Sequence, residues 1–327
     1  MSVTLKDIEQ AAARLDGVAI RTPLLENAWL NQKLGAKVFL KPESLQHIGA
    51  FKFRGAYNRL SQLNAEQRSR GVVAFSSGNH AQGVAYAAKL LGMQATIVMP
   101  SDAPHIKLQA TADLGATVRL YDRHSESREQ IAADLAAISG ATLVPAFDDI
   151  DVIAGQGSCG LELMQQLAQQ GCEPDVVLSP VGGGGLMAGV STAVKALHPG
   201  SRIYGVEPEN FNDHYLSQRA AERIRIPGTS ATLCDALMAT TPGQITWSIN
   251  QQHVSDYLLV SEDDVAHAIS YAFRYLKLVV EPGGVVALAA LLQNKIDVRG
   301  MRVALILSGA NIDPDTFIRC LRQFPSP

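Results

Sequence analysis

The chain has 327 residues, a net charge of −3 and 18% charged residues, which excludes the basic character of a typical nucleic-acid-binding protein. Its hydrophobic content of 47% is that of a globular protein, and its length favours two domains over one small core. The four scattered cysteines argue against a disulfide framework or a zinc site, and the lack of a signal core or membrane-spanning apolar run predicts a cytoplasmic protein.

The predicted elements change character along the chain. Before residue 70 we expect a helix over 4–16 with Thr4 as its N-cap, a strand over 37–42 and a helix over 56–63. Strands then alternate with helices: strands over 72–75, 95–99, 117–121 and 143–144, and helices over 81–91, 106–114 and 126–138. A second set of strands and helices follows. Its strands are expected over 176–178, 202–206, 257–260 and 303–307. Its helices are expected over 150–170, 186–197 and 282–292, with another that ends at residue 276, and residues 208–250 are rich in turns.

Short connections between alternating strands and helices predict an α/β fold with parallel sheets covered by helices. The two sets predict two domains. The larger would comprise residues 1–65 and 148–327, and the smaller would be residues 66–147, inserted into it.

Lys52 lies between Phe51 and Phe53, in a run that Gly49 opens and Gly55 closes. A desolvated lysine has a lowered pKa, so its amine is nucleophilic near neutral pH and can form a Schiff base with an aldehyde or ketone. The alternative is a helix start with an ordinary exposed lysine. The run by itself leaves both interpretations open.

Four consecutive glycines, 182–185, lie between a predicted strand and a predicted helix. Glycines let the backbone approach a ligand, and a helix N-terminus favours an anion, so this stretch predicts a phosphate site. The spacing Gly183-x-Gly185-x-x-Ala188, with Glu207 following 24 residues after Gly183, also fits a dinucleotide fingerprint. A nicotinamide-dependent dehydrogenase is therefore a competing hypothesis, although it gives Lys52 no role.

Two other strand ends carry polar residues. The turn Ser76-Ser77-Gly78-Asn79-His80 opens a helix, whose free N–H groups could bind a carboxylate; a simple capping turn is the alternative. Ser308 ends the last strand, where ligands collect in parallel sheets, and its hydroxyl could bind a ring nitrogen. The oxygen-rich stretch from Glu207 to Asp213 predicts either a hard-cation site or a solvated acidic loop.

Together these segments resemble the fold type II pyridoxal-phosphate enzymes, in the serine/threonine dehydratase and serine racemase branch. The matching motifs are Gln46-x-x-Gly49-Ala50-Phe51-Lys52-Phe53-Arg54-Gly55-Ala56, Ser76-Ser77-Gly78-Asn79-His80, Gly182 to Gly185, and Ser308-Gly309-x-Asn311. They occur in the family's order over nearly the whole chain. The resemblance implies a tryptophan synthase β-like fold with two open, twisted, mostly parallel sheets, and a homodimer.

The resemblance also implies roles for individual residues. Lys52 would hold the cofactor aldehyde and act as a base. The other cofactor contacts would be Phe51 against the ring, Asn79 at the phenolic oxygen, Gly182, Gly183, Gly184 and Gly185 at the phosphate, and Ser308 at the ring nitrogen. The substrate carboxylate would be bound by Ser76, Ser77, Gly78, Asn79 and His80. Ser77 would act on the face opposite Lys52, and Glu207, the Phe211 carbonyl and Asp213 would bind Mg²⁺, Mn²⁺ or Ca²⁺.

The implied reaction is β-elimination of a hydroxy amino acid, such as L-serine, L-threonine or threo-3-hydroxyaspartate, to a 2-oxo acid and ammonia. The run around Lys52 looks most like that of the serine racemase and threo-3-hydroxyaspartate dehydratase subgroup. Serine racemase is therefore the main alternative activity, and a non-catalytic binding protein is disfavoured because it would not require both Lys52 and Ser77. His47 is either a partner for a second substrate carboxylate or a surface histidine.

Overall fold

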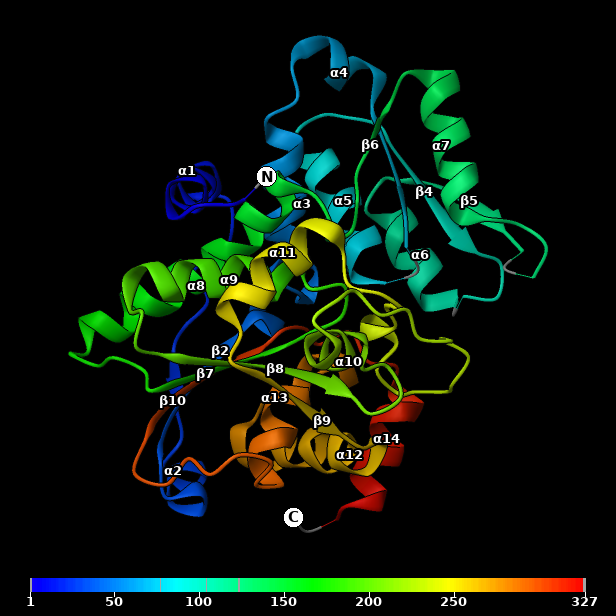
Figure 1. The fold of residues 1–327 in the computed structure, drawn as a ribbon. Helices are drawn as coiled ribbons and strands as arrows, with labels where there is room; N and C mark the ends of the chain where they lie inside the picture. Colours follow the sequence, from blue (N-terminus) through cyan, green and yellow to red (C-terminus); the bar gives the residue numbers. More distant parts are fainter. Residues whose placement is uncertain (1, 77, 104, 123, 326–327) are drawn as a thin grey trace.

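The computed structural model describes residues 2–76, 78–103, 105–122 and 124–325. It contains two parallel-rich sheets with helices on their faces, as the sequence predicts (Figure 1). Within these ranges, no helix combines the length and the apolar character needed to cross a bilayer.

The larger sheet has six strands in the order β1-β2-β10-β7-β8-β9. Their bounds are β1 (Leu25–Glu26), β2 (Lys37–Pro42), β7 (Val176–Pro180), β8 (Arg202–Pro208), β9 (Asp256–Val260) and β10 (Arg302–Leu307). Only β1 runs antiparallel to its neighbour. The central strand β10 is buried along Val303–Leu307 because helices cover both faces of the sheet. Its end brings Ser308 close to the end of β7 and to the glycines that follow it.

Helices form one layer on each face of the larger sheet (Figure 1). One layer contains α8 (Ile150–Gln169) and α9 (Gly185–Leu197), and the other contains α12 (Glu262–Tyr271), α13 (Pro282–Leu292) and α14 (Pro314–Gln323). Every residue of α13 is buried, because it packs between the sheet and α12. The remaining helices are α1 (Leu5–Leu15), α2 (Ala28–Leu34), α3 (Lys52–Ser61), α10 (Asp213–Ala220) and α11 (Gln244–His253), with the short turns η1 (Glu43–Leu45), η2 (His47–Gly49) and η3 (Asp235–Leu237) and the π-helix η4 (Ala272–Leu276).

The smaller sheet has four parallel strands in the order β5-β4-β3-β6. They are β3 (Val72–Phe75), β4 (Ala95–Pro100), β5 (Thr117–Tyr121) and β6 (Thr142–Leu143). Around them lie α4 (Ala65–Arg70), α5 (Asn79–Leu90), α6 (His105–Asp113) and α7 (Arg128–Ser139). The order is that of an open parallel sheet, so the strand ends of β3 and β4 lie at one edge, where α5 begins.

The structure differs from the predicted elements in three places. The helix predicted to begin at residue 56 begins at Lys52 and continues through Gly55. Gly55 does not interrupt the helix but allows close packing, because a Cβ atom there would lie 2.8 Å from the Val152 carbonyl oxygen. The helix predicted to end at residue 276 divides into α12 and the π-helix η4. Several short helices were not predicted at all, namely α2, α4, α10, α11 and α14.

Candidate active site

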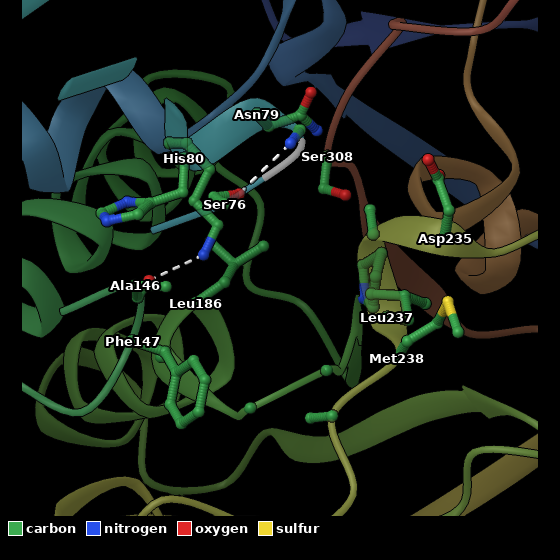
Figure 2. A pocket seen from close by; sticks show the side chains of 18 of the residues that line it. Ser76, Asn79, His80, Ala146, Phe147, Leu186, Asp235, Leu237, Met238 and Ser308 are labelled. Carbon is green, nitrogen blue, oxygen red and sulfur yellow. Dashed lines mark hydrogen bonds between the residues drawn. The ribbon is translucent and has the colours of Figure 1, made fainter. Parts of the chain in front are cut away.

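A pocket of about 220 Å³ lies at the carboxyl ends of strands from both sheets. One water molecule needs about 30 Å³, so the space suits a larger ligand. The predicted residues that line it are Phe51, Lys52, Ser76, Gly78, Asn79, His80, Gly182, Gly183, Gly184, Gly185 and Ser308. Ser77 lies outside the described residues. Asp235, Leu237 and Met238 face Ser76 and Ala146 across the open space (Figure 2).

Lys52 is the first residue of α3 and extends its amine into this pocket. Its Nζ atom donates a hydrogen bond to the carbonyl oxygen of Ala146 at 2.7 Å, the lower dashed line in Figure 2, and lies 5.2 Å from the centre of the Phe51 ring. Burial lowers the pKa of Lys52 to about 8, although the nearby Glu281 carboxyl acts in the opposite direction. The structure therefore supports the nucleophilic amine predicted from sequence rather than an ordinary exposed lysine.

A network of buried ion pairs anchors the start of α3. The guanidinium of Arg54 donates to both carboxylate oxygens of Glu43 and of Glu162, and Lys41 binds Glu162 at 2.8 Å. The side chains of Arg54, Glu43 and Lys41 are fully buried. Charges this deep are tolerated only when each has a partner, so the network fixes α3 against α8. The position of Lys52 follows from that anchoring.

The glycine loop is shaped by α11. The Gly183 carbonyl accepts from the Thr246 hydroxyl at 2.7 Å, and the Gly184 carbonyl accepts from the Asn250 amide at 3.3 Å. Because a trans peptide directs its N–H opposite to its carbonyl, the N–H groups of Gly184 and Gly185 point away from these α11 side chains. Gly184 has φ of 92°, and a Cβ at Gly183 would lie 2.4 Å from the Phe147 ring, so both positions require glycine.

Asn79 and His80 begin α5, but their side chains make different contacts. The Asn79 Nδ2 donates to Glu281 at 2.6 Å, and its Oδ1 accepts from Asn311 at 2.7 Å. The His80 ring lies 3.0 Å from the Val144 carbonyl through Nε2, and burial lowers its pKa to about 3. His80 is therefore a neutral ring held by the backbone at the pocket wall.

Several pocket residues were not predicted from sequence. They are Phe75, Lys107, Arg128, Ala146, Phe147, Asp235, Leu237, Met238 and Glu281. The charges among them lie at helix starts or in turns, where a solvent-exposed role is the usual interpretation. His47, in contrast, is not among the described residues that line the pocket: its Nε2 lies 2.9 Å from the Val18 carbonyl oxygen, and its ring packs on Phe53.

Glu207 and Asp213 form a second buried acidic site, away from the pocket lining. The Glu207 carboxylate accepts from the backbone N–H groups of His214 and Tyr215 at 3.0 and 2.8 Å. Both oxygens of Asp213 are buried without a hydrogen-bond partner. Burial raises the pKa of both carboxyls, and Asp213 raises that of Glu207 further. No group of three or more His, Cys, Asp or Glu side chains among the described residues is arranged to hold a metal ion.

Comparison with known proteins identifies the family. Residues 15–309 match the family described as pyridoxal-phosphate dependent enzymes. The chain belongs to the pyridoxal-phosphate dependent enzyme family. It is 45% identical to an L-threo-3-hydroxyaspartate ammonia-lyase of Pseudomonas sp., over 97% of this chain and 98% of that one. It is 43% identical to the Saccharomyces cerevisiae protein of the same name, over 95% and 94% of the two chains.

A solved structure agrees with this assignment. Maize serine racemase superposes with a TM-score of 0.92 at 35% identity, covering 99% of this chain and 98% of that one. Membership of the pyridoxal-phosphate family removes the dehydrogenase hypothesis. Its key residue, Glu207, is fully buried and bound to the backbone of α10, so it is not free to bind a ribose.

The pocket fits the family's cofactor. An amine with a lowered pKa, a glycine loop and a serine at a strand end line one cavity. A Cβ atom at Gly183 or Gly185 would meet Phe147, and one at Gly184 would meet His214, so only the backbone of these residues is available to a ligand.

Proposed function

We propose that this protein is a pyridoxal-phosphate-dependent ammonia-lyase: it eliminates water from a β-hydroxy amino acid, and the enamine that is released takes up one water molecule to give a 2-oxo acid and ammonia. The observation that carries the proposal is the amine of Lys52, which is half-buried, hydrogen-bonded to the Ala146 carbonyl and part of the same pocket as the glycine loop. The two ammonia-lyases that are 45% and 43% identical over nearly the whole chain support it.

The proposed cofactor contacts use the residues that line the pocket. Gly182, Gly183, Gly184 and Gly185 would hold the phosphate, Ser308 the ring nitrogen, Asn79 the phenolic oxygen, and Phe51 would lie against the ring. When bound, the cofactor withdraws electrons from the substrate and makes its α-proton acidic. The neutral hydroxyl of Ser308, unlike a carboxylate, would not stabilise a protonated ring nitrogen, which would favour prompt elimination.

Lys52 would take the α-proton of the substrate. Its lowered pKa suits a general base near neutral pH. The turn at residues 76–80, which leads into α5, would bind the substrate α-carboxylate. In this arrangement the α-carbon would lie between the carboxylate site and the amine, so that the proton could pass directly to Nζ.

We further propose that the substrate is a dicarboxylic hydroxy amino acid, namely threo-3-hydroxyaspartate. Two cations of the smaller sheet's helices, Lys107 and Arg128, line the pocket. Lys107 is already paired with Asp235 of η3. Arg128 is also paired, through Nε with Glu129 Oε1 at 2.9 Å, but at a half-exposed position, and its guanidinium carbon lies 5.4 Å from the centre of the Phe75 ring, at the pocket wall. A guanidinium pairs well with a carboxylate, so Arg128 is the candidate receptor for the second carboxylate.

Serine racemase remains the second candidate activity. It is favoured by the similarity to maize serine racemase over nearly the full chain. In that case Ser77 would exchange a proton on the face of the substrate opposite Lys52.

One set of initial rates separates the two candidate activities. The substrates are L-serine, L-threonine and the four 3-hydroxyaspartate isomers, and D-serine and 2-oxo acid are measured together. We expect the highest kcat/KM with a threo isomer, and D-serine formation exceeding elimination would favour the racemase.

We propose a divalent cation, such as Mg²⁺, Mn²⁺ or Ca²⁺, bound by Glu207, Asp213 and the backbone carbonyl of Phe211. The unpartnered buried oxygens of Asp213 support this, since a buried carboxylate without a partner is costly and hard cations prefer oxygen ligands. The His214 ring, which follows Asp213, lies against Gly184. A cation here would therefore stabilise the back of the glycine loop.

We also propose that the chain forms a homodimer and divides into domains at residues 1–65 with 148–327 and residues 66–147. The four-stranded sheet lies wholly within the second range, which supports the division.

For the dimer, the candidate surface is formed by α2 and η4, which are joined by a hydrogen bond from Asn27 to the Tyr275 carbonyl. This surface exposes Trp29, at 69%, together with Tyr275. Exposed aromatic side chains of this size are typical of interfaces. Sedimentation velocity would test the dimer.

A further inference from the structure

Glu281 is a buried carboxyl group at the pocket wall that the proposed reaction does not use. It precedes α13 and is only 2% exposed. Its Oε1 accepts a hydrogen bond of 2.6 Å from the Asn79 amide nitrogen, across 202 residues of sequence. Its carboxyl group packs directly against Gly309, where a Cβ atom would lie 2.1 Å from Oε1. The packing leaves the carboxyl group little freedom to turn away from Asn79.

The hydrogen bonds of Asn311 determine which way the Asn79 amide faces. Asn311 Nδ2 donates to the carbonyl oxygen of Ile48 at 2.8 Å and to Asn79 Oδ1 at 2.7 Å. A backbone carbonyl can only accept, so the Asn311 atom that faces it must be the nitrogen. Both hydrogens of that nitrogen are then used, and the Asn79 atom that faces it must be the oxygen. Asn79 Nδ2 must therefore face Glu281.

One hydrogen of Asn79 is left over. An amide nitrogen carries two, and Glu281 accepts one of them. Asn79 lines the pocket, so the second N–H is available to a ligand there. The acceptor at Ile48 is itself firmly placed: Ile48 has φ of 56°, a conformation that costs energy for a β-branched residue and persists only where its surroundings impose it.

We propose that Glu281 and Asn311 form a clamp that fixes the Asn79 amide, so that its remaining N–H is presented to the phenolic oxygen of the bound cofactor. Glu281 is thus a positioning residue, acting through Asn79. The proposal rests on the proposed function, because it needs the cofactor in this pocket.

The electrostatics of Glu281 indicate which variant should replace it. Burial raises the pKa of Glu281 to about 8, and the Asp235 carboxyl adds to the rise. The side chain is then mostly the neutral acid at pH 7, and glutamine has the same shape and the same carbonyl acceptor. Glu281→Gln should keep the clamp, whereas Glu281→Ala removes it.

The test compares these two variants, with absorbance and kinetics measured on the holoenzyme and cofactor affinity measured by titrating the apoenzyme. We expect Glu281→Ala to weaken the affinity for pyridoxal phosphate by roughly tenfold, the usual scale of one lost hydrogen bond, and to shift the absorbance maximum of the bound cofactor. It should also lower kcat/KM by roughly 10²-fold, because the cofactor ring is no longer held in its reactive position. Glu281→Gln should retain affinity and absorbance within about twofold. Equal defects in both variants would overturn the clamp and indicate that the acidic proton itself acts.

A double-mutant cycle decides whether Glu281 acts through Asn79. In the Asn79→Ala background, Glu281→Ala should change affinity and absorbance by less than about twofold, since the group it positions is gone. A full additional loss in that background would overturn the proposal. If Glu281→Ala does not fold, as judged by its melting temperature, Asn311→Asp tests the other half of the clamp, since a carboxylate cannot donate to Ile48 or to Asn79. Wild-type protein that binds no pyridoxal phosphate would refute the proposed function instead, so the two failures are distinct.

Discussion

The amine of Lys52 lies 2.7 Å from the carbonyl oxygen of Ala146, which joins the start of α3 to the segment that follows β6, 94 residues away. A carbonyl only accepts, so Lys52 donates to it in either protonation state. In the neutral state the lone pair of Nζ is then directed elsewhere, and the remaining space around the amine is the pocket. The contact therefore orients the nucleophile before any ligand binds.

Lys52→Ala should abolish both cofactor attachment and catalysis. We expect the absorbance near the visible edge to disappear and the rate of 2-oxo acid formation to fall by at least about 10³-fold, as is usual when a covalent catalytic group is removed. Absorbance spectra and product assays measure these effects. Lys89→Ala, at an exposed position on α5, is the matched control and should leave both unchanged. Normal absorbance in Lys52→Ala would assign the attachment to another amine.

The reaction of the apoenzyme with pyridoxal phosphate should depend on pH through Lys52. The free amine is the reactive form, and its fraction rises as pH approaches the pKa from below. With the pKa of Lys52 lowered to about 8, the rate should increase about tenfold per unit between pH 6 and 7 and level off above pH 8. Stopped-flow absorbance measures it. A rate that continues to rise to pH 10 would mean that burial does not activate this lysine.

Arg128→Gln should discriminate between substrates. A hydrogen bond to a charged group contributes about 1.5–3 kcal/mol, so the KM for threo-3-hydroxyaspartate should rise about 10- to 150-fold, with little change for L-serine. Arg119→Gln, an exposed substitution on β5, serves as the control. Steady-state kinetics with both substrates measure the effect. Equal losses for the two substrates would show that Arg128 supports the fold rather than the second carboxylate.

Removing divalent cations should destabilise the protein. A cation at a hundred times its Kd adds about 2.7 kcal/mol to the free energy of unfolding, so a chelator should lower the melting temperature by roughly 5 °C. Added Mg²⁺ or Ca²⁺ should restore it. Asp213→Asn should not respond to the chelator, whereas the exposed control Asp297→Asn should respond as wild type does. An unchanged wild-type melting temperature would argue against the Glu207 and Asp213 site.

Short local patterns pointed to residues that the fold brings into one pocket. Two patterns can each be recognised within ten residues: Lys52 between two phenylalanines, and the four glycines before a helix. Both line the same pocket. The alternation of strands and helices predicted both sheets. Local patterns also misled: the spacing from Gly183 to Glu207 suggested a dinucleotide site, whereas the Glu207 carboxylate is buried against the backbone of α10.

The residues that sequence reasoning missed depend on contacts across the fold. Glu281 stands before Pro282 and Gly283, which look like an ordinary helix start, and nothing nearby in sequence indicates its contact with Asn79. Arg128 looks like the exposed first turn of a helix, and only the placement of α7 beside Phe75 brings it to the pocket. Such contacts follow from sheet order and helix packing, which a local pattern does not encode.

The most direct test of the central proposal is the stoichiometry of the products. Purified protein with its bound pyridoxal phosphate would be incubated with L-threo-3-hydroxyaspartate, and ammonia, the 2-oxo acid and the remaining amino acid would be measured over time. We predict equal amounts of ammonia and 2-oxo acid, matching the substrate consumed, and no product from Lys52→Ala. Loss of optical activity without ammonia, or no turnover of any hydroxy amino acid by protein that binds the cofactor, would contradict the assignment of this site as an ammonia-lyase.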